Sequence, residues 1–123
     1  MSLIPENLKY TKDHEWALVE SGTATVGVTD HAQRELGDIV FVELPKVGAS
    51  VRAGESFGTI EAVKTVAELY APVSGTVEAV NTDLGADAGV INTDPYGKGW
   101  IVKIKVDGAT PELISADEYT KLI

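Results

Sequence analysis

The sequence predicts a mostly β fold, a compact barrel or sandwich of short strands with a few short helices. The first observation is a series of short β-prone runs separated by turn residues, with frequent glycine between Gly48 and Gly75. The second is a composition of 44% hydrophobic and 24% charged residues, which is typical of a packed globular protein. With 123 residues, we expect one domain that covers residues 1–123.

Five of the strands can be placed from local pattern. Residues 15–19 and 23–28 are β-prone runs on either side of a Glu-Ser-Gly turn, which is the pattern of a hairpin. Residues 39–44 form a strongly apolar run, and we expect a largely buried strand there. Two further runs, residues 56–60 and 65–70, are short strands separated by only a few residues.

Two short helices are predicted from their capping residues. Asp30 can cap a helix with Gln33 three residues later, and Gly37 suits the positive backbone angle that closes such a helix. Near the C-terminus, Ser115 and Glu118 have the spacing of a second capping box. We expect this C-terminal helix to pack on the barrel.

One more strand is predicted between these two helices. Residues 101–106 alternate apolar and polar side chains, which predicts a half-buried strand with Lys103 and Lys105 facing solvent. Beyond that strand, Thr110 and Pro111 suit the cap and the first turn of a helix.

Charge and cysteine content exclude several classes of function. The formal net charge of −9 comes from 19 acidic against 10 basic side chains, and such a field repels nucleic acid and anionic membranes. No apolar run approaches the roughly 20 residues of a membrane span. The absence of cysteine rules out disulfides, thiolate nucleophiles and Cys-based metal sites. Because the N-terminus shows no targeting pattern, we expect a cytoplasmic protein, although a mature mitochondrial form would look the same.

Lys64 is the candidate functional residue. It follows Glu61-Ala-Val and lies between the runs 56–60 and 65–70, so we expect its amine at a hairpin tip in water. Position alone is weak evidence, because most lysines on protein surfaces are simply solvated.

The wider sequence around Lys64 resembles the lipoyl-attachment segment of glycine cleavage H proteins. Glu61 lies three residues before the lysine and Gly75 eleven after it, as in lipoyl domains in general. Further similarity to this family is found in four other blocks, residues 10–16, 27–33, 36–45 and 92–104, in the same order along the chain.

The resemblance implies a fold and a set of site residues. The fold is a lipoyl/biotinyl-type flattened β-barrel, a barrel-sandwich hybrid, with short helices that include one at the C-terminus. Lys64 is the lipoyl attachment point, and Glu61 and Gly75 help a lipoate-attaching enzyme to recognise the hairpin. Glu15 and Glu68 match acidic positions near a cleft for the loaded arm, whereas Glu35 carries no such implication.

The implied function is that of a carrier without catalysis of its own. Lipoate on Lys64 accepts the aminomethyl group when glycine decarboxylase, a pyridoxal-phosphate enzyme, removes carbon dioxide from glycine. The arm then visits the aminomethyltransferase, which uses tetrahydrofolate, and the dihydrolipoyl dehydrogenase. The sequence contains neither a Gly-rich phosphate loop nor a serine-triad string.

Three alternatives remain open at this stage. Ala62 and Val66 stand where the family commonly has serine and alanine, which leaves room for an H-like relay protein that hands lipoate to other complexes. A biotin carrier is a weaker alternative, because Val63 and Thr65 replace both methionines of the biotin motif. A noncovalent interaction module of barrel type would need no modification at all. We expect no metal site, because His14 and His31 are the only histidines and no further ligands have suitable spacing.

Overall fold

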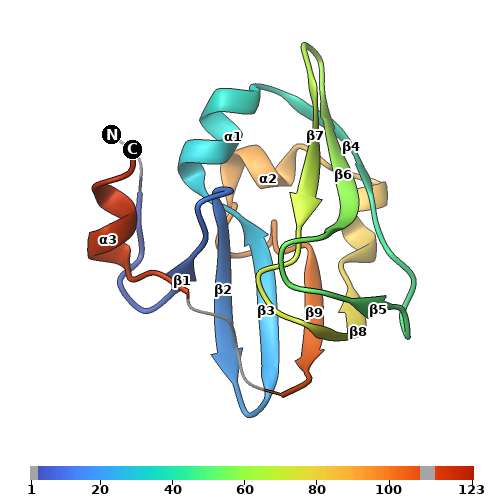
Figure 1. Cartoon of the computed structure of the whole chain (residues 1–123). Helices are drawn as coiled ribbons and strands as arrows, with labels where there is room; N and C mark the ends of the chain where they lie inside the picture. Colours follow the sequence, from blue (N-terminus) through green and yellow to red (C-terminus); the bar gives the residue numbers. More distant parts are fainter. Residues whose placement is uncertain (1–2, 109–112) are drawn as a thin grey trace.

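The computed structural model describes residues 3–108 and 113–123, and it shows two antiparallel sheets (Figure 1). The predicted turn at Thr110 and Pro111 lies outside the described residues. The six-stranded sheet has the order β1 (Lys9–Tyr10), β2 (Glu15–Glu20), β3 (Thr23–Val28), β9 (Val102–Val106), β8 (Gly75–Val80), β5 (Ser50–Val51). The three-stranded sheet has the order β4 (Ile39–Glu43), β6 (Ser56–Ala62), β7 (Val66–Tyr70).

The helices are few and short, as expected for the predicted fold class. They are α1 (Asp30–Leu36), α2 (Val90–Thr93), α3 (Ala116–Thr120) and the 3-10 turn η1 (Thr82–Gly85). None of the helices in the described part of the chain is long and apolar enough to cross a membrane. The mostly β prediction is therefore confirmed, including the short helix near the C-terminus.

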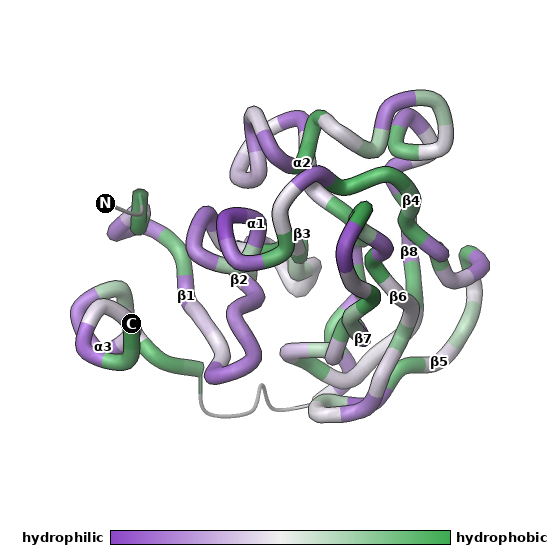
Figure 2. The backbone as a smooth tube through the Cα atoms, turned by 90° about the horizontal axis from the view of Figure 1, so that it is seen from above, coloured by the Kyte–Doolittle hydropathy of each residue, from purple (hydrophilic) through white to green (hydrophobic). Residues whose placement is uncertain are grey.

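The main hydrophobic core contains side chains of both sheets. Viewed from above, β4, β6 and β7 lie on one side of the molecule, while β1 and α3 lie on the other (Figure 2). Inward-facing residues supply this core, and strands such as β8 and β9 show the period-two alternation of buried and more exposed side chains. Its members include Val26 and Ile104 of the first sheet and Val42, Ile60 and Leu69 of the second.

The β2–β3 hairpin confirms the sequence prediction and shows why the turn works. Ser21 and Gly22 have φ values of 50° and 81°. Two consecutive positive φ values are what the preferred two-residue hairpin turn requires, because its twist matches that of the flanking strands. This turn fixes the register in which Glu15 lies opposite Val28.

The expectation that residues 39–44 form a largely buried strand is wrong in part. Ile39 and Val42 are buried, but Val40 and Phe41 are 55% and 51% exposed. The pairing of β4 with β6 is irregular between Ile39 and Phe41, which is the position of a β-bulge. A bulge adds one residue to one strand, so two neighbouring side chains can both point outward.

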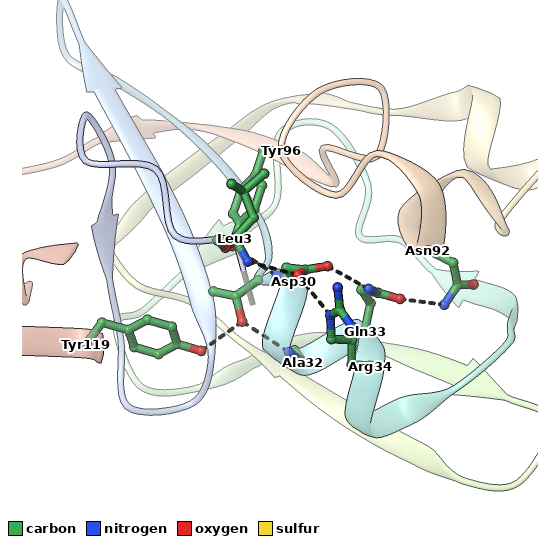
Figure 3. Close-up of polar contacts among 9 residues, drawn as sticks. Leu3, Asp30, Ala32, Gln33, Arg34, Asn92, Tyr96 and Tyr119 are labelled. Carbon is green, nitrogen blue, oxygen red and sulfur yellow. Dashed lines mark hydrogen bonds and ion pairs between the residues drawn. The ribbon is translucent and has the colours of Figure 1, made fainter. Parts of the chain in front are cut away.

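The N-cap of α1 is Thr29, and the prediction that Asp30 caps this helix is wrong. The Thr29 Oγ1 accepts a hydrogen bond from the Ala32 backbone N–H at 3.1 Å. Asp30 is the first helical residue, and its carboxylate accepts hydrogen bonds from Gln33, from Arg34 and from the Leu3 backbone N–H (Figure 3). Gly37 closes the helix with a φ of 80°, as predicted.

A second, smaller core joins α3 to β1 and β2. The predicted capping box at Ser115 and Glu118 is present. The rings of Tyr10 and Tyr119 stack with centroids 4.8 Å apart and an interplanar angle of 9°. Both tyrosines are fully buried, so α3 is packed on the sheet rather than loosely attached.

Gly75 lies at a close backbone crossing in the six-stranded sheet, so its replacement is a test of the packing there. A Cβ at this position would lie 2.0 Å from the Lys105 carbonyl oxygen and 2.9 Å from the Ile104 Cγ2. We expect Gly75→Ala to lower the free energy of unfolding by about 1–3 kcal/mol, the usual cost of forcing a methyl group into packed structure. Urea unfolding measures this loss. The matched control is Gly85→Ala, because a Cβ at Gly85 meets nothing within 4 Å. Equal stability of the two variants would contradict the prediction.

Candidate functional site

Lys64 lies at the tip of the β6–β7 hairpin, as predicted. The Ala62 backbone N–H donates to the Thr65 carbonyl at 2.7 Å, which closes a tight turn around Val63 and Lys64. Residues 63–66 are all exposed. The hairpin extends past the end of α1 in Figure 1.

The tip of the hairpin is held from below by the connection between α1 and β4. The Val63 backbone N–H donates to the Asp38 carbonyl at 3.0 Å. The Lys64 Cε lies 3.4 Å from where a Cβ would be at Gly37, so the stem of the lysine passes over this glycine. A backbone tether of this kind limits the motion of an otherwise free hairpin tip.

The residues flanking Lys64 differ in their accessibility. Glu61 is exposed, and the register places it between Phe41 of β4 and Val66 of β7. Val66 is 60% exposed, whereas Ala62 is only 5% exposed. Of the two departures from the family's usual string, only the one at Val66 therefore changes the outer surface.

The structure does not bring Gly75 to the hairpin. Gly75 is the first residue of β8 in the six-stranded sheet, where it pairs with Val51 and Val106. The close approach of the Lys105 carbonyl gives a packing reason for glycine at this position.

A cleft of about 160 Å³ lies beside the hairpin, between β7, α1 and the loop before β2. Its lining is mainly apolar, and the polar residues of the lining are mostly acidic. The apolar lining comes from Val28, Ala32, Leu36, Ile60, Ala67 and Leu69, and the polar lining from Asp13, His14, Glu15, Glu35 and Glu68. Leu36 lines the cleft and is followed directly by Gly37, which the Lys64 side chain lies against. The cleft is therefore close to Lys64.

Glu15 is the buried carboxyl of this cleft. Its side chain is held by two donors, the Tyr70 backbone N–H at 3.1 Å and the Thr11 hydroxyl at 3.0 Å. The residue is 2% exposed. Burial raises the pKa of Glu15 from its ordinary value of 4.5 to about 8, against the opposing effect of the two hydrogen bonds. A pKa of about 8 favours the protonated form of this carboxyl at neutral pH.

Glu68 and Glu35 stand on opposite walls of the same cleft. Glu68 is exposed on β7 and accepts a hydrogen bond from the Ser56 hydroxyl at 2.5 Å. Glu35 lies on α1, with its side chain 73% exposed and 3.7 Å from the His31 Nε2. Glu15 and Glu68 thus line the same cleft.

Sequence reasoning missed the contribution of α1 to the cleft. Ala32, Glu35 and Leu36 lie on one face of this helix with the spacing of three and four residues, and that spacing is the signal that was available. Nothing in the sequence alone says that this face meets the hairpin.

The two histidines are neighbours but form no metal centre with other ligands in the described ranges. Their rings lie 4.8 Å apart. The described residues contain no group of three or more histidine, cysteine or acidic side chains arranged to hold a metal ion. Burial, followed by the nearby His31, lowers the pKa of His14 below its ordinary value of 6.5.

Comparison with known proteins gives a consistent result across sequence and structure. A family model described as "Glycine cleavage H-protein" matches residues 8–123. The glycine cleavage system H protein of Rubrobacter xylanophilus is 56% identical over 121 residues, covering 98% of this chain and 95% of that protein. The H protein of Chlorobium phaeobacteroides is 58% identical over 124 residues, with 98% and 97% coverage.

A solved structure extends this likeness to the fold. The crystal structure of a glycine cleavage system H protein from Mycobacterium marinum matches with a TM-score of 0.91 at 45% identity, covering 96% of this chain and 97% of that one. This structural match is consistent with the predicted flattened barrel-sandwich arrangement of the two sheets. The chain belongs to the glycine cleavage H-protein family.

Proposed function

We propose that this protein is the lipoyl carrier of the glycine cleavage system and that Lys64 carries the lipoyl group. The observation that supports this most directly is the exposed Lys64 amine on a tethered hairpin tip, beside a cleft of mainly apolar lining. The chain is a carrier subunit and not an enzyme. Its role is to present a reactive group that it does not itself possess.

The apolar lining of the cleft fits a neutral arm better than a charged one. Amide formation at Lys64 removes the charge of the ammonium group, and burying a charge without a partner costs far more than burying an amide. Leu36 of α1 and Ile60 of β6 both contribute apolar surface to the cleft. When attached, lipoate supplies the disulfide and dithiol chemistry by which an aminomethyl group is carried.

The acidic rim of the cleft fits an amine at the end of that arm. Glu15 and Glu68 would flank such an amine, and an ammonium group nearby would favour the ionised form of Glu15. Glu35 adds a third acidic side chain from α1. The chain itself would thus shelter the cargo, and its carboxylates would keep the amine of the cargo protonated. Bond making and breaking would occur on the partner enzymes.

The proposed partners follow from this role. They are glycine decarboxylase, the aminomethyltransferase and the dihydrolipoyl dehydrogenase, together with the enzyme that attaches lipoate. A group tethered to one fixed amine turns each transfer into a local search at high effective concentration. The net charge of −9 would speed encounters with basic partner surfaces. We also propose a cytoplasmic location, which the bacterial origin of the relatives supports.

In the proposed attachment of lipoate, Glu61 and Gly75 would act in different ways. Glu61 is exposed beside Lys64 and can touch the attaching enzyme directly. Gly75 lies in the other sheet, so its contribution would act through the shape of the fold.

The attachment proposal is tested by intact mass. After incubation with lipoate, ATP and a lipoate-attaching enzyme, we expect the wild type to gain the mass of one lipoyl group and Lys64→Arg to gain none. Lys46→Arg is the matched control and should be modified like the wild type. An unmodified wild type would contradict the proposal. If the lipoylated protein supports no exchange of labelled bicarbonate into glycine with the decarboxylase, the relay function replaces glycine cleavage.

The shelter proposal is tested by the lifetime of the cargo. Hydrolysis of the aminomethyl group releases formaldehyde and ammonia and leaves a thiol, so formaldehyde appearance measures its rate. We expect release from the loaded protein to be roughly tenfold slower than from a free lipoamide adduct, which corresponds to about 1.4 kcal/mol of arm–cleft interaction. Equal rates would show that the cleft gives no shelter.

The raised pKa of Glu15 predicts a pH dependence of stability. The folded protein holds this proton up to about pH 8, whereas the unfolded chain releases it near the ordinary value of 4.5. The free energy of unfolding should therefore fall as the pH rises through this window, by at most about 1.4 kcal/mol per pH unit, and then level off. Glu15→Gln should lack this component, so its stability relative to the wild type should increase from pH 5 to pH 8. Parallel profiles from urea unfolding would contradict the assignment.

A further inference from the structure

Tyr119 belongs to the C-terminal helix α3, yet its hydroxyl reaches His14, which lines the cleft, and Thr29, the N-cap of the helix α1 that lines the cleft as well. The residue is completely buried. Its Oη lies 2.8 Å from the His14 Nδ1 and 2.8 Å from the Thr29 Oγ1, so it shares a hydrogen bond with each. Figure 3 shows Tyr119 pointing toward the start of α1, near Ala32.

The two hydrogen-bond partners of Tyr119 control different walls. His14 lies in the loop before β2 and lines the cleft next to Glu15. Thr29 is the N-cap of α1, and the same Oγ1 accepts the Ala32 backbone N–H. Because α1 supplies the facing apolar wall, one phenolic hydroxyl joins both sides of the cleft.

His14 is a residue whose backbone needs support from its surroundings. Its φ is 67°, in the left-handed region that residues other than glycine rarely adopt. The His14 carbonyl accepts the Thr29 backbone N–H at 3.0 Å, and its ring packs against His31 of α1. The bond to Tyr119 fixes the ring end of this residue.

We propose that Tyr119 is a positioning residue for the arm cleft, so that the C-terminal helix sets the distance between the His14 loop and the first turn of α1. This inference rests on the proposed function of the cleft. Tyr119 itself does not touch the arm, because it is covered by the residues it orients. Loss of its hydroxyl releases both walls and admits water to the cargo.

The structure contains a matched control for this idea in the partner of the ring stack. Tyr10 is also fully buried, and its hydroxyl donates to the Pro5 carbonyl at 2.6 Å. Tyr119→Phe and Tyr10→Phe each keep the stacked rings and remove one hydroxyl. Only the first change breaks the hydrogen bonds to His14, which lines the cleft, and to Thr29, the N-cap of α1.

The experiment compares these two variants in two measurements. In the unmodified protein, we expect Tyr119→Phe to speed amide hydrogen exchange at Thr29 and Gln33, whose N–H groups donate to the His14 and Thr29 carbonyls. In the loaded protein, formaldehyde release should rise at least roughly fivefold, because fivefold is the usual effect of one lost buried hydrogen bond and the Tyr119 hydroxyl makes two. Tyr10→Phe should leave both measurements at the wild-type value, although its unfolding midpoint falls as well.

Each outcome decides the matter. If the wild-type cargo is sheltered and the two variants release formaldehyde equally, the positioning role is wrong while the cleft function stands. If the wild type releases it as fast as free lipoamide, the cleft function fails and this inference fails with it. Should Tyr119→Phe not fold, Thr29→Ser and Thr29→Val replace it: the serine keeps the hydroxyl and should retain the wild-type lifetime, whereas valine should shorten it. Equal lifetimes for these two would overturn the proposal.

Discussion

The pairing of β6 with both β4 and β7 is the constraint on which the arrangement of the site depends. It holds the hairpin upright in a three-stranded sheet, and the bond from the Val63 N–H to the Asp38 carbonyl fixes the tip. Lys64 therefore combines an exposed amine with a backbone that is held in a fixed position. A flexible loop could expose the amine equally well, but it would not keep the cleft next to it. The carrier role needs both properties at once, because the arm must reach out to partners and return to the same place.

The features that sequence could predict are those that depend on neighbours along the chain. The β2–β3 turn, the capping box at Ser115 and the tip position of Lys64 all follow from local residue types. The N-cap of α1 differs from the prediction by one residue, because Thr29 and Asp30 are both suitable caps. The other difference lies where a distant segment decides. Val40 and Phe41 are exposed because β4 bulges against β6, and local hydrophobicity says nothing about a bulge.

The candidate site divides in the same way. Lys64 and Glu61 could be recognised from their spacing, because one hairpin contains both. The cleft could not be derived from spacing, since its walls are assembled from three separate segments. The link from Tyr119 to His14 crosses 105 positions of sequence, and the share of Glu35 in the rim depends on how α1 sits against the hairpin. Such contacts are set by packing, and periodicity alone does not reveal which faces meet.

The hydrogen bond from the Tyr70 N–H to Glu15 has a consequence for the behaviour of the protein in concentrated solution. β7 is an edge strand, and the cleft is the space along its unpaired side. An edge strand offers free backbone donors and acceptors to a strand from another molecule, which is a common route to aggregation. The Glu15 carboxyl occupies one of these donors, and α1 stands across the remaining opening. The residues that would receive the arm therefore also protect the sheet edge, so a substitution that widens the cleft also exposes a surface for self-association.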